Sequence, residues 1–197
     1  TSCLSLMGVD IKYLDIGGGF GIAYTENEKY FDVRALAREV KKIVSGSGLK
    51  LILEPGRFIS GPSGILVSKV IYTKYAAHKN FVIADAAMND LIRPAFYGAY
   101  HQIIPVIRKN TKKIVADIVG PVCESGDFLA KGRRIGRLSA GDLIAVKNAG
   151  AYGFVMSSNY NSRRRAAEVM VKGSKFQIVR DREKMEDLTR GERICGL

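Results

Sequence analysis

Hydrophobic and polar positions follow strand and helix patterns in turn over the first sixty or so residues. Residues 13–16 predict a short strand that runs into Gly17-Gly18-Gly19, and residues 49–53 predict a second strand that leads into Glu54-Pro55-Gly56-Arg57. Between them, apolar residues recur with helical spacing after Asp32, which is suited to cap a helix, and Gly46 ends the pattern. The apolar positions of this helix are Val33, Leu36, Ala37, Val40, Ile43 and Val44. This order of strand, glycine turn, helix, strand and charged turn is typical of a parallel α/β unit.

After about Ser63, β-branched residues dominate and helical periodicity mostly fades. Strands are predicted at residues 65–75, 80–85, 113–119, 142–146 and 168–171. The turn Lys172-Gly173-Ser174-Lys175 follows one apolar stretch and precedes another, so it predicts a hairpin and, with the other strands, an antiparallel β domain. We place the boundary near Gly64, with an α/β unit at residues 1–64 and a β domain at residues 65–197. The charged end, residues 180–197, is expected to fray.

The composition is that of a globular protein, since 47% of the 197 residues are hydrophobic. No apolar stretch is long enough to predict a membrane span. The net charge of +12 invites a nucleic-acid partner, but the basic residues are scattered and lack the interleaved aromatic side chains of a base-stacking surface. Solvated surface is the simpler explanation, so neither nucleic acid nor a membrane is predicted as a partner. A basic nucleic-acid-binding module stays open as an alternative from a different class.

Cysteine and histidine usage favours a reducing compartment and predicts no metal centre. The three cysteines are Cys3, Cys123 and Cys195. They are odd in number and too far apart for a zinc-type pair or a disulfide framework, so we expect a cytoplasmic protein. His78 and His101 have no metal-ligand partner four residues on, and each is expected to be a surface or packing histidine. The chain opens Thr1-Ser2-Cys3, without an initiator methionine or a basic signal region, and is expected to be a processed or truncated piece.

Candidate binding residues follow the two strands of the α/β unit. Gly17-Gly18-Gly19 can bring backbone amides close to a phosphate, although a plain tight turn explains the triplet equally well. Gly56 and Arg57 lie at the end of the next strand, where a parallel α/β sheet or barrel gathers its ligand. Glu54 is suited to face a ring nitrogen, and Arg57 to bind a carboxylate or phosphate. The alternative makes Glu54 a helix-cap partner and Arg57 its surface counterion.

The β domain carries three further candidate segments. Arg93-Pro94-Ala95-Phe96-Tyr97 holds a cation and a phenol near a rigid proline. Asn148-Ala149-Gly150-Ala151-Tyr152-Gly153 places a tyrosine among small residues, which leave room for a ligand or let two strands pack tightly. In Gly120-Pro121-Val122-Cys123-Glu124-Ser125-Gly126-Asp127, a thiol that can exchange a proton adjoins a carboxylate suited to a substrate ammonium. The alternative for Cys123 is a small buried thiol before an ordinary turn.

Taken together in this order, five motifs closely resemble those of the fold-type III pyridoxal-phosphate decarboxylases. The motifs are Gly17-Gly18-Gly19-Phe20-Gly21, Glu54-Pro55-Gly56-Arg57, Arg93 to Tyr97, Cys123-Glu124-Ser125-Gly126-Asp127 and Gly150-Ala151-Tyr152. The resemblance runs from about Tyr13 to Val171. The Cys-Glu-Ser-Gly-Asp form, with Ser157-Ser158-Asn159-Tyr160-Asn161-Ser162 downstream, points to the branch that decarboxylates meso-2,6-diaminopimelate to L-lysine. Arg164 and Ala166 depart from the prolines that the family often has.

The resemblance implies an α/β plus β fold, in which the last strands of a (β/α)8 barrel carry the cofactor and the antiparallel β domain follows. It implies pyridoxal 5'-phosphate as cofactor and a homodimer with shared active sites. The lysine that links covalently to the cofactor would lie upstream, so this chain alone is expected to be inactive. Residues implied for the cofactor phosphate are Gly18, Gly19, Gly56, Arg57 and Tyr152. Glu54 would pair with the pyridine nitrogen.

The same resemblance implies how the substrate is bound. Its carboxylate and ammonium groups would be held by Arg57, Arg93, Tyr97, Tyr152 and Glu124. Cys123, reaching from the partner subunit, would be the catalytic residue that returns a proton to the α-carbon. Two enzyme-related alternatives remain: a decarboxylase of another amino acid or of carboxynorspermidine, and a non-catalytic paralogue that keeps the fold and the dimer interface. A partial barrel would also expose apolar faces and unpaired edges, so we expect aggregation or dependence on a missing half.

Overall fold

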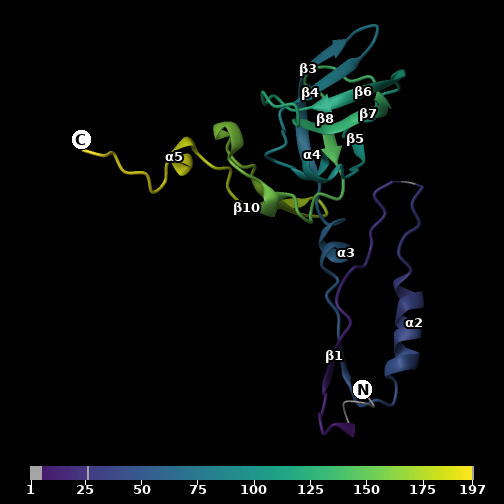
Figure 1. Ribbon diagram of the computed structural model, residues 1–197. Helices are drawn as coiled ribbons and strands as arrows, with labels where there is room; N and C mark the ends of the chain where they lie inside the picture. The colour runs from purple at the N-terminus through teal and green to yellow at the C-terminus, as the bar shows by residue number, and fades with distance from the viewer. Residues whose placement is uncertain (1–5, 26, 197) are drawn as a thin grey trace.

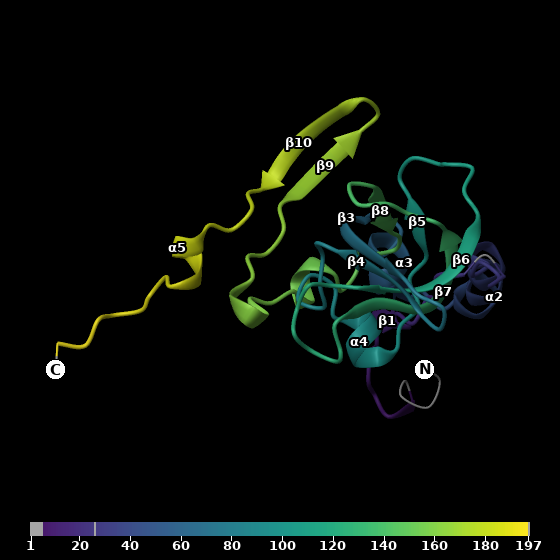
Figure 2. The ribbon, with the colours of Figure 1, turned by 90° about the horizontal axis from the view of Figure 1, so that it is seen from above.

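The computed structural model describes residues 6–25 and 27–196, so the opening Thr1-Ser2-Cys3 lies outside the described residues. Figure 1 shows three parts: an arm that contains the first strands and helix α2, a β-sheet body in teal and green, and a C-terminal extension in yellow. The arm joins the body through helix α3. Seen from above in Figure 2, the C-terminal hairpin and tail project away from the sheet body.

The arm is the parallel α/β unit that the hydrophobic pattern predicts. Strands β1 (Tyr13–Asp15) and β2 (Lys50–Ile52) pair in parallel, and helix α2 (Val33–Val44) connects them. One carboxylate oxygen of Asp32 accepts the amides of Arg34 at 3.0 Å and Ala35 at 2.9 Å, which satisfies two donors that a helix start leaves free. Past the other end, Gly46 has a φ of +81°, a conformation that favours glycine. The predicted cap and end of this helix are therefore confirmed.

The body is a six-stranded sheet within the described residues, with the order β5-β8-β3-β4-β6-β7. Its strands are β3 (Leu66–Tyr75), β4 (Asn80–Ala84), β5 (Ile103–Pro105), β6 (Lys113–Val119), β7 (Phe128–Gly136) and β8 (Leu143–Val146). Four of the five neighbouring pairs are antiparallel, as predicted, but β4 and β6 run parallel. The sheet is therefore mixed. Between β4 and β6 the chain passes through α4 and through β5 at the edge of the sheet, and β6 then returns beside β4 in the same direction.

The buried core lies on one face of this sheet, and alternation along the strands selects its members. In β4, Val82 and Ala84 are fully buried. The edge strands β5 and β7 approach each other, so the sheet is nearly closed around the apolar side chains. The core consists of Val70, Val82, Ala84, Ala86, Leu91, Ile103, Ala116, Ile118, Leu129, Ala130, Ile135, Leu138, Ile144 and Val146.

The remaining helices of the described residues are single turns. They are α3 (Gly56–Ser60), α4 (Arg93–Tyr97), α5 (Met185–Leu188) and the 3-10 turns η1 (Phe154–Met156) and η2 (Tyr160–Ser162). Among all helices in residues 6–25 and 27–196, none combines the length and apolar character that crossing a membrane requires.

The C-terminal extension begins with the predicted hairpin, formed by β9 (Glu168–Lys172) and β10 (Lys175–Arg180). The following tail differs from the expected frayed end, because part of it is hydrogen-bonded. The Glu183 carboxylate accepts the Arg165 backbone amide at 2.7 Å and guanidinium at 3.0 Å, and also the Asn159 amide at 2.6 Å. These bonds tie the tail to the loop before β9.

Candidate functional site

The glycine loop after β1 packs against the charged turn after β2. The Glu54 amide donates to the Gly17 carbonyl at 2.9 Å, and a Cβ added to Gly18 would overlap the Glu54 carbonyl oxygen. Gly19 has a φ of +80°, and a Cβ there would meet nothing within 4 Å. Glycine is thus required at position 18 by close approach and is favoured at position 19 by conformation. Both turns follow the carboxyl ends of parallel strands, so they lie at the same end of the α/β unit.

Helix α3 begins at Gly56 and carries Arg57, and its C-terminal end packs against the loop that carries Tyr152. Gly150 lies so close to the end of α3 that an added Cβ would overlap the Ser60 carbonyl oxygen and lie 2.7 Å from the Gly64 amide nitrogen. The Gly150 amide donates to the Gly61 carbonyl at 3.2 Å. The small residues around Tyr152 therefore serve close backbone packing between segments ninety residues apart in sequence.

Tyr152 itself holds an unusual backbone conformation, with a φ of +58°. A bulky residue in this region costs about 1–3 kcal/mol and persists only where the surrounding structure enforces it. Asn148 has the same φ, and its side-chain amide donates to the Ala23 carbonyl at 3.1 Å. The turn that presents Tyr152 is thus fixed both to α3 and to the loop that follows the glycine triplet.

Tyr24, which no sequence motif singled out, brings the predicted arginines together. Its hydroxyl accepts a hydrogen bond from Arg93 Nη1 at 2.8 Å and a longer one from Arg57 Nη1 at 3.5 Å. Both guanidinium groups also lie over its ring, at 5.9 Å for Arg57 and 5.3 Å for Arg93. The Arg93 guanidinium carbon is also 5.9 Å from the centroid of the Tyr152 ring. Four side chains from separate segments therefore form one aromatic and cationic cluster.

Arg93 is almost entirely buried, with 7% of its surface exposed. A buried guanidinium requires hydrogen-bond acceptors, and its Nη1 has the Tyr24 hydroxyl and His101 Nε2, the latter at 3.1 Å. His101 is fully buried and its Nδ1 contacts the Lys147 carbonyl at 2.9 Å. Burial, followed by the positive charges of Arg93 and Arg133, lowers the pKa of His101. His101 is therefore a packing histidine, whereas His78 is exposed at the surface.

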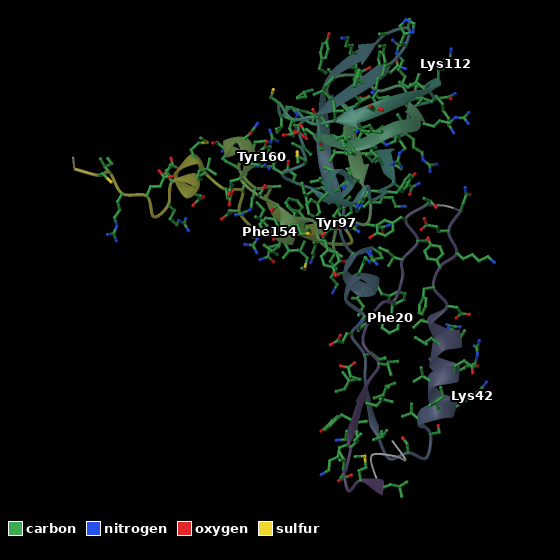
Figure 3. The ribbon with its side chains drawn as sticks, in the orientation of Figure 1. Phe20, Lys42, Tyr97, Lys112, Phe154 and Tyr160 are labelled. Carbon is green, nitrogen blue, oxygen red and sulfur yellow. The ribbon has the colours of Figure 1, made fainter. Side chains whose placement is uncertain are left out.

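Tyr97 lies one helical turn after Arg93 on α4, so the two side chains share a face of that helix. The residue is 60% exposed, and its ring packs edge-to-face against Phe96 at a centroid distance of 4.8 Å. Tyr97 has no direct contact with the Tyr24 cluster among the interactions of the described residues. Figure 3 places it where the sheet body meets the arm.

The Cys123–Glu124 turn is built on Asp127. Its buried carboxylate accepts the Met88 amide on Oδ1 and the Val122 amide on Oδ2, both at 2.7 Å. The Asp127 amide in turn donates to the Glu124 carbonyl at 3.0 Å. One charge-assisted bond thus closes the turn at Val122, and the other ties it to Met88. Cys123 in this turn is exposed rather than buried.

Glu124 is ionised and exposed at the top of this turn. Its carboxylate accepts the Gly126 amide at 3.3 Å and the Tyr160 hydroxyl at 3.1 Å. The Gly126 bond, and then the Tyr160 bond, lower the pKa of Glu124, while the same contact raises the pKa of Tyr160. These partners differ from those of Arg57 and Arg93, so the predicted residues form two groups within one chain. Tyr160 and Tyr97 are labelled at separate places in Figure 3.

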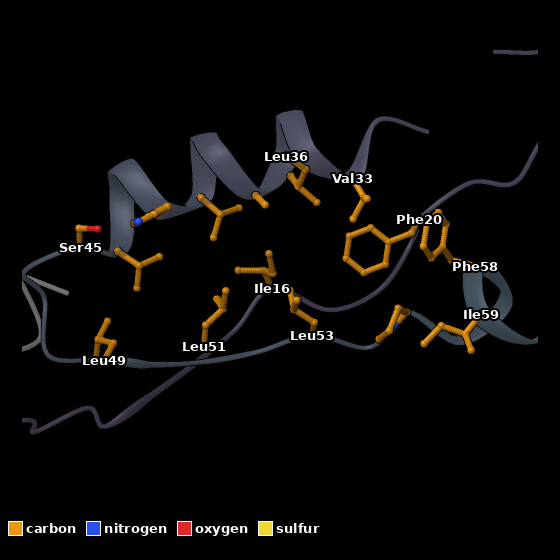
Figure 4. Close-up of a pocket in the computed structure, with 15 residues that line it drawn as sticks. Ile16, Phe20, Val33, Leu36, Ser45, Leu49, Leu51, Leu53, Phe58 and Ile59 are labelled. Atoms are coloured by element: carbon orange, nitrogen blue, oxygen red, sulfur yellow. The ribbon is translucent and has the colours of Figure 1, made fainter. Parts of the chain in front are cut away.

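The apolar groove in Figure 4 lies elsewhere, between α2 and strands β1 and β2, and has a volume of about 550 Å³. Its walls are almost wholly apolar, whereas a small-molecule site also needs converging polar groups to orient its ligand. Leu36 of α2 faces Leu51 and Leu53 across this space. Ile43, predicted to share the inner stripe, is instead 78% exposed. The groove is therefore the space between helix α2 and the β1–β2 pair of the α/β unit, and we do not assign it a ligand.

Comparisons with known proteins agree with the family resemblance. A sequence model of the family described as "Pyridoxal-dependent decarboxylase, C-terminal sheet domain" matches residues 14–150. The chain is 53% identical over 180 residues to "Diaminopimelate decarboxylase" of Aquifex aeolicus, covering 91% of this chain and 43% of that protein. It is 49% identical over 195 residues to the protein of the same name from Neisseria meningitidis, covering 99% and 48%.

Solved structures share the fold. The chain superposes with a TM-score of 0.88 on diaminopimelate decarboxylase from Helicobacter pylori, crystallised with L-lysine, at 40% identity. That match covers 96% of this chain and 46% of the other. The chain belongs to the pyridoxal-dependent decarboxylase family, whose C-terminal sheet domain model it matches. It spans less than half the length of the curated relatives described here.

Proposed function

We propose that this chain is the C-terminal part of an enzyme that decarboxylates meso-2,6-diaminopimelate to L-lysine, the last step of lysine biosynthesis, with pyridoxal phosphate. The observation that carries the proposal is the joining of Arg57 and Arg93 on the Tyr24 hydroxyl, beside Tyr152. This cluster supplies cationic and phenolic groups for anions, and it occurs in a chain about half identical to enzymes of that name.

The residues present fit the phosphate of this cofactor. Gly18 lets the glycine loop pack against the Glu54 carbonyl, and Cβ positions at Gly19 and Gly56 open onto free space, so a phosphate can approach the glycine loop and the start of α3. Arg57 and Tyr152 would add a cation and a phenol hydroxyl. Glu54, whose carbonyl packs against Gly18, would pair with the ring nitrogen through its side chain. When bound, pyridoxal phosphate supplies the electron sink for the α-carbon electrons left as carbon dioxide departs, and a protonated ring nitrogen strengthens it.

Substrate recognition follows from charge. Diaminopimelate carries two carboxylates and two ammonium groups, and Arg57, Arg93 and Tyr97 would hold a carboxylate end. Tyr152 would contribute from the opposite loop. Glu124 would bind the distal ammonium, and its lowered pKa supports this role because the carboxylate stays ionised at neutral pH.

Cys123 would return a proton to the α-carbon from the neighbouring subunit. In a single chain, the turn that carries Cys123 is hydrogen-bonded to Asp127 and, through Glu124, to Tyr160. None of these partners belongs to the cluster of Arg57 and Arg93 around Tyr24. A site completed by two copies accounts for this division, so the homodimer with shared active sites belongs to the proposal. A cytoplasmic location also remains an expectation from cysteine usage.

Residues 1–64 would be the last part of the cofactor-binding (β/α)8 barrel, and residues 65–197 the β domain. The parallel pairing of β1 and β2 across α2 supports the first assignment. The cofactor-linked lysine would come from the preceding half of the barrel. If the intact protein has no such lysine, the non-catalytic paralogue becomes the better explanation.

The test is turnover by the intact parent protein with pyridoxal phosphate. We expect release of carbon dioxide and L-lysine from meso-diaminopimelate, with the highest kcat/KM among a panel that includes ornithine, arginine and carboxynorspermidine. Faster turnover of another member of the panel would reject the substrate, and no turnover of any member would reject the enzyme.

The proton-donor role has a separate test. Replacement Cys123→Ala in the intact enzyme should reduce the rate of product formation at the protonation step by about 10²-fold or more, while the cofactor stays bound. Cofactor absorbance and single-turnover kinetics measure these two effects, with Cys195→Ala as the matched control for loss of an exposed thiol. An unchanged rate and product for Cys123→Ala would reject the role.

A further inference from the structure

His101 is the buried group next to the candidate site that the proposed function does not use. It is fully buried, yet both ring nitrogens have partners: Nε2 lies 3.1 Å from Arg93 Nη1, and Nδ1 lies 2.9 Å from the Lys147 carbonyl oxygen. A guanidinium can only donate, and a carbonyl can only accept. The partners therefore assign the neutral tautomer, in which Nδ1–H donates to Lys147 and Nε2 accepts from Arg93.

The charged surroundings of the ring favour the same protonation state. Arg93 of α4 and Arg133 of β7 are the cations that act on His101, and the Tyr24 ring packs edge-on against it at 5.4 Å. Arg133 in turn stacks on Tyr100, with its guanidinium carbon 3.6 Å from the ring centroid. An imidazolium at this position would be buried between two positive charges and would turn a second donor toward Arg93.

We propose that His101 is a positioning residue: its neutral Nε2 anchors the Arg93 guanidinium so that Arg93 can bind a substrate carboxylate. The inference rests on the proposed function. Both side-chain hydrogen bonds of Arg93 within the described residues leave from Nη1, one to His101 and one to Tyr24. A planar guanidinium fixed at one nitrogen has its remaining N–H groups fixed in direction. His101 would thereby determine the geometry of carboxylate binding without touching the substrate.

This arrangement makes substrate binding dependent on pH. The folded-state pKa of His101 lies below its ordinary value of 6.5, so the ring is neutral near pH 7. As pH falls through the folded-state pKa, the ring gains a proton and Nε2 ceases to accept from Arg93. We therefore expect KM for the substrate to rise on the acid side of neutrality, and the stability that the neutral ring contributes to be lost over the same range.

Two substitutions separate this role from packing. In His101→Asn, the amide can still donate to the Lys147 carbonyl but offers no acceptor at the position of Nε2. In His101→Gln, the longer side chain can place an amide oxygen near Arg93. In the intact holoenzyme we expect His101→Asn to raise KM for meso-diaminopimelate roughly tenfold or more, with a smaller effect on kcat. His101→Gln should stay within roughly threefold of the unsubstituted enzyme and should lose the acid-side rise in KM.

Equal effects of the two variants on KM, or an acid-side rise that persists in His101→Gln, would overturn the inference. The dissociation constant of pyridoxal phosphate serves as the control, because it should be unchanged in both. Should either variant fold poorly, 15N NMR of the imidazole in the unsubstituted protein decides the matter: the Nδ1–H tautomer is expected, and an Nε2–H tautomer or an imidazolium at pH 7 contradicts it. Lack of any turnover of diaminopimelate would instead reject the proposed function, while the NMR result would still test the Arg93–His101 contact.

Discussion

The packing of Gly150 against the end of α3 gives the sharpest test of how the site is assembled. Replacement Gly150→Ala adds one methyl group where the nearest atoms are the Ser60 carbonyl oxygen and the Gly64 amide nitrogen. Both are backbone atoms, so no side chain can rotate to make room. The Tyr152 loop and α3 must therefore separate, and the hydrogen bond from Gly150 to the Gly61 carbonyl must stretch or break.

The size of the effect follows from that separation. The added Cβ would lie 2.7 Å from the Gly64 nitrogen and nearer still to the Ser60 oxygen, so the two segments must move apart by on the order of 1 Å. Such misplacement of a binding group can reduce kcat/KM about 10²-fold. Overpacking also lowers the free energy of unfolding by about 1–3 kcal/mol. Because Tyr152 moves relative to Arg57, we expect the affinity for pyridoxal phosphate to fall as well.

The assay is a cofactor titration and a thermal melt of the intact protein, with Gly21→Ala as the matched control. A Cβ at Gly21 would meet nothing within 4 Å, and the residue does not have a positive φ, so its stability should change by less than about 0.5 kcal/mol. If Gly150→Ala were as stable as this control and bound the cofactor equally well, the close approach between α3 and the Tyr152 loop would have no role in forming the site.

Two further predictions concern the Cys123 turn. Asp127→Asn should lower the free energy of unfolding by about 2–3 kcal/mol, because its amide nitrogen would face one of the two N–H groups, at Met88 or Val122, that Asp127 now accepts. Chemical denaturation measures this change. A loss below about 0.5 kcal/mol would contradict the prediction. Tyr160→Phe should raise the pKa of Glu124 toward its ordinary value, because the hydrogen bond that stabilises the carboxylate is lost. The carboxylate would then be protonated at a higher pH as acid is added. An unchanged Glu124 titration, followed by 13C NMR, would show that the Tyr160 hydroxyl does not stabilise the carboxylate.

Local signals predicted the elements well where they depend on neighbours in sequence. The Asp32 cap, the end of α2 just before Gly46 and the β9–β10 hairpin follow from residues a few positions apart. The sequence did not predict strand β7, because the polar and glycine residues 131–134 interrupt its apolar pattern. Pairing with β6 along most of its length supplies the stability that the local sequence does not indicate.

The sequence allowed several residues of the candidate site to be chosen, but it did not predict which side chains contact one another there. Arg57, Arg93 and Tyr152 could be chosen from motifs, whereas Tyr24 contacts arginines 33 and 69 positions away and has no motif of its own. His101 was expected to be either a surface or a packing residue, because nothing in sequence indicated that it would be buried against Arg93. Only the fold shows which long-range partners satisfy a buried guanidinium.

The central claim is that the loops bearing Gly19, Arg57 and Tyr152 bind one phosphate group. A crystal structure of the intact parent protein grown with pyridoxal phosphate tests it most directly. We predict that the phosphate lies within hydrogen-bond distance of the glycine-loop amides and the Tyr152 hydroxyl. A cofactor bound with its phosphate away from both would contradict the account.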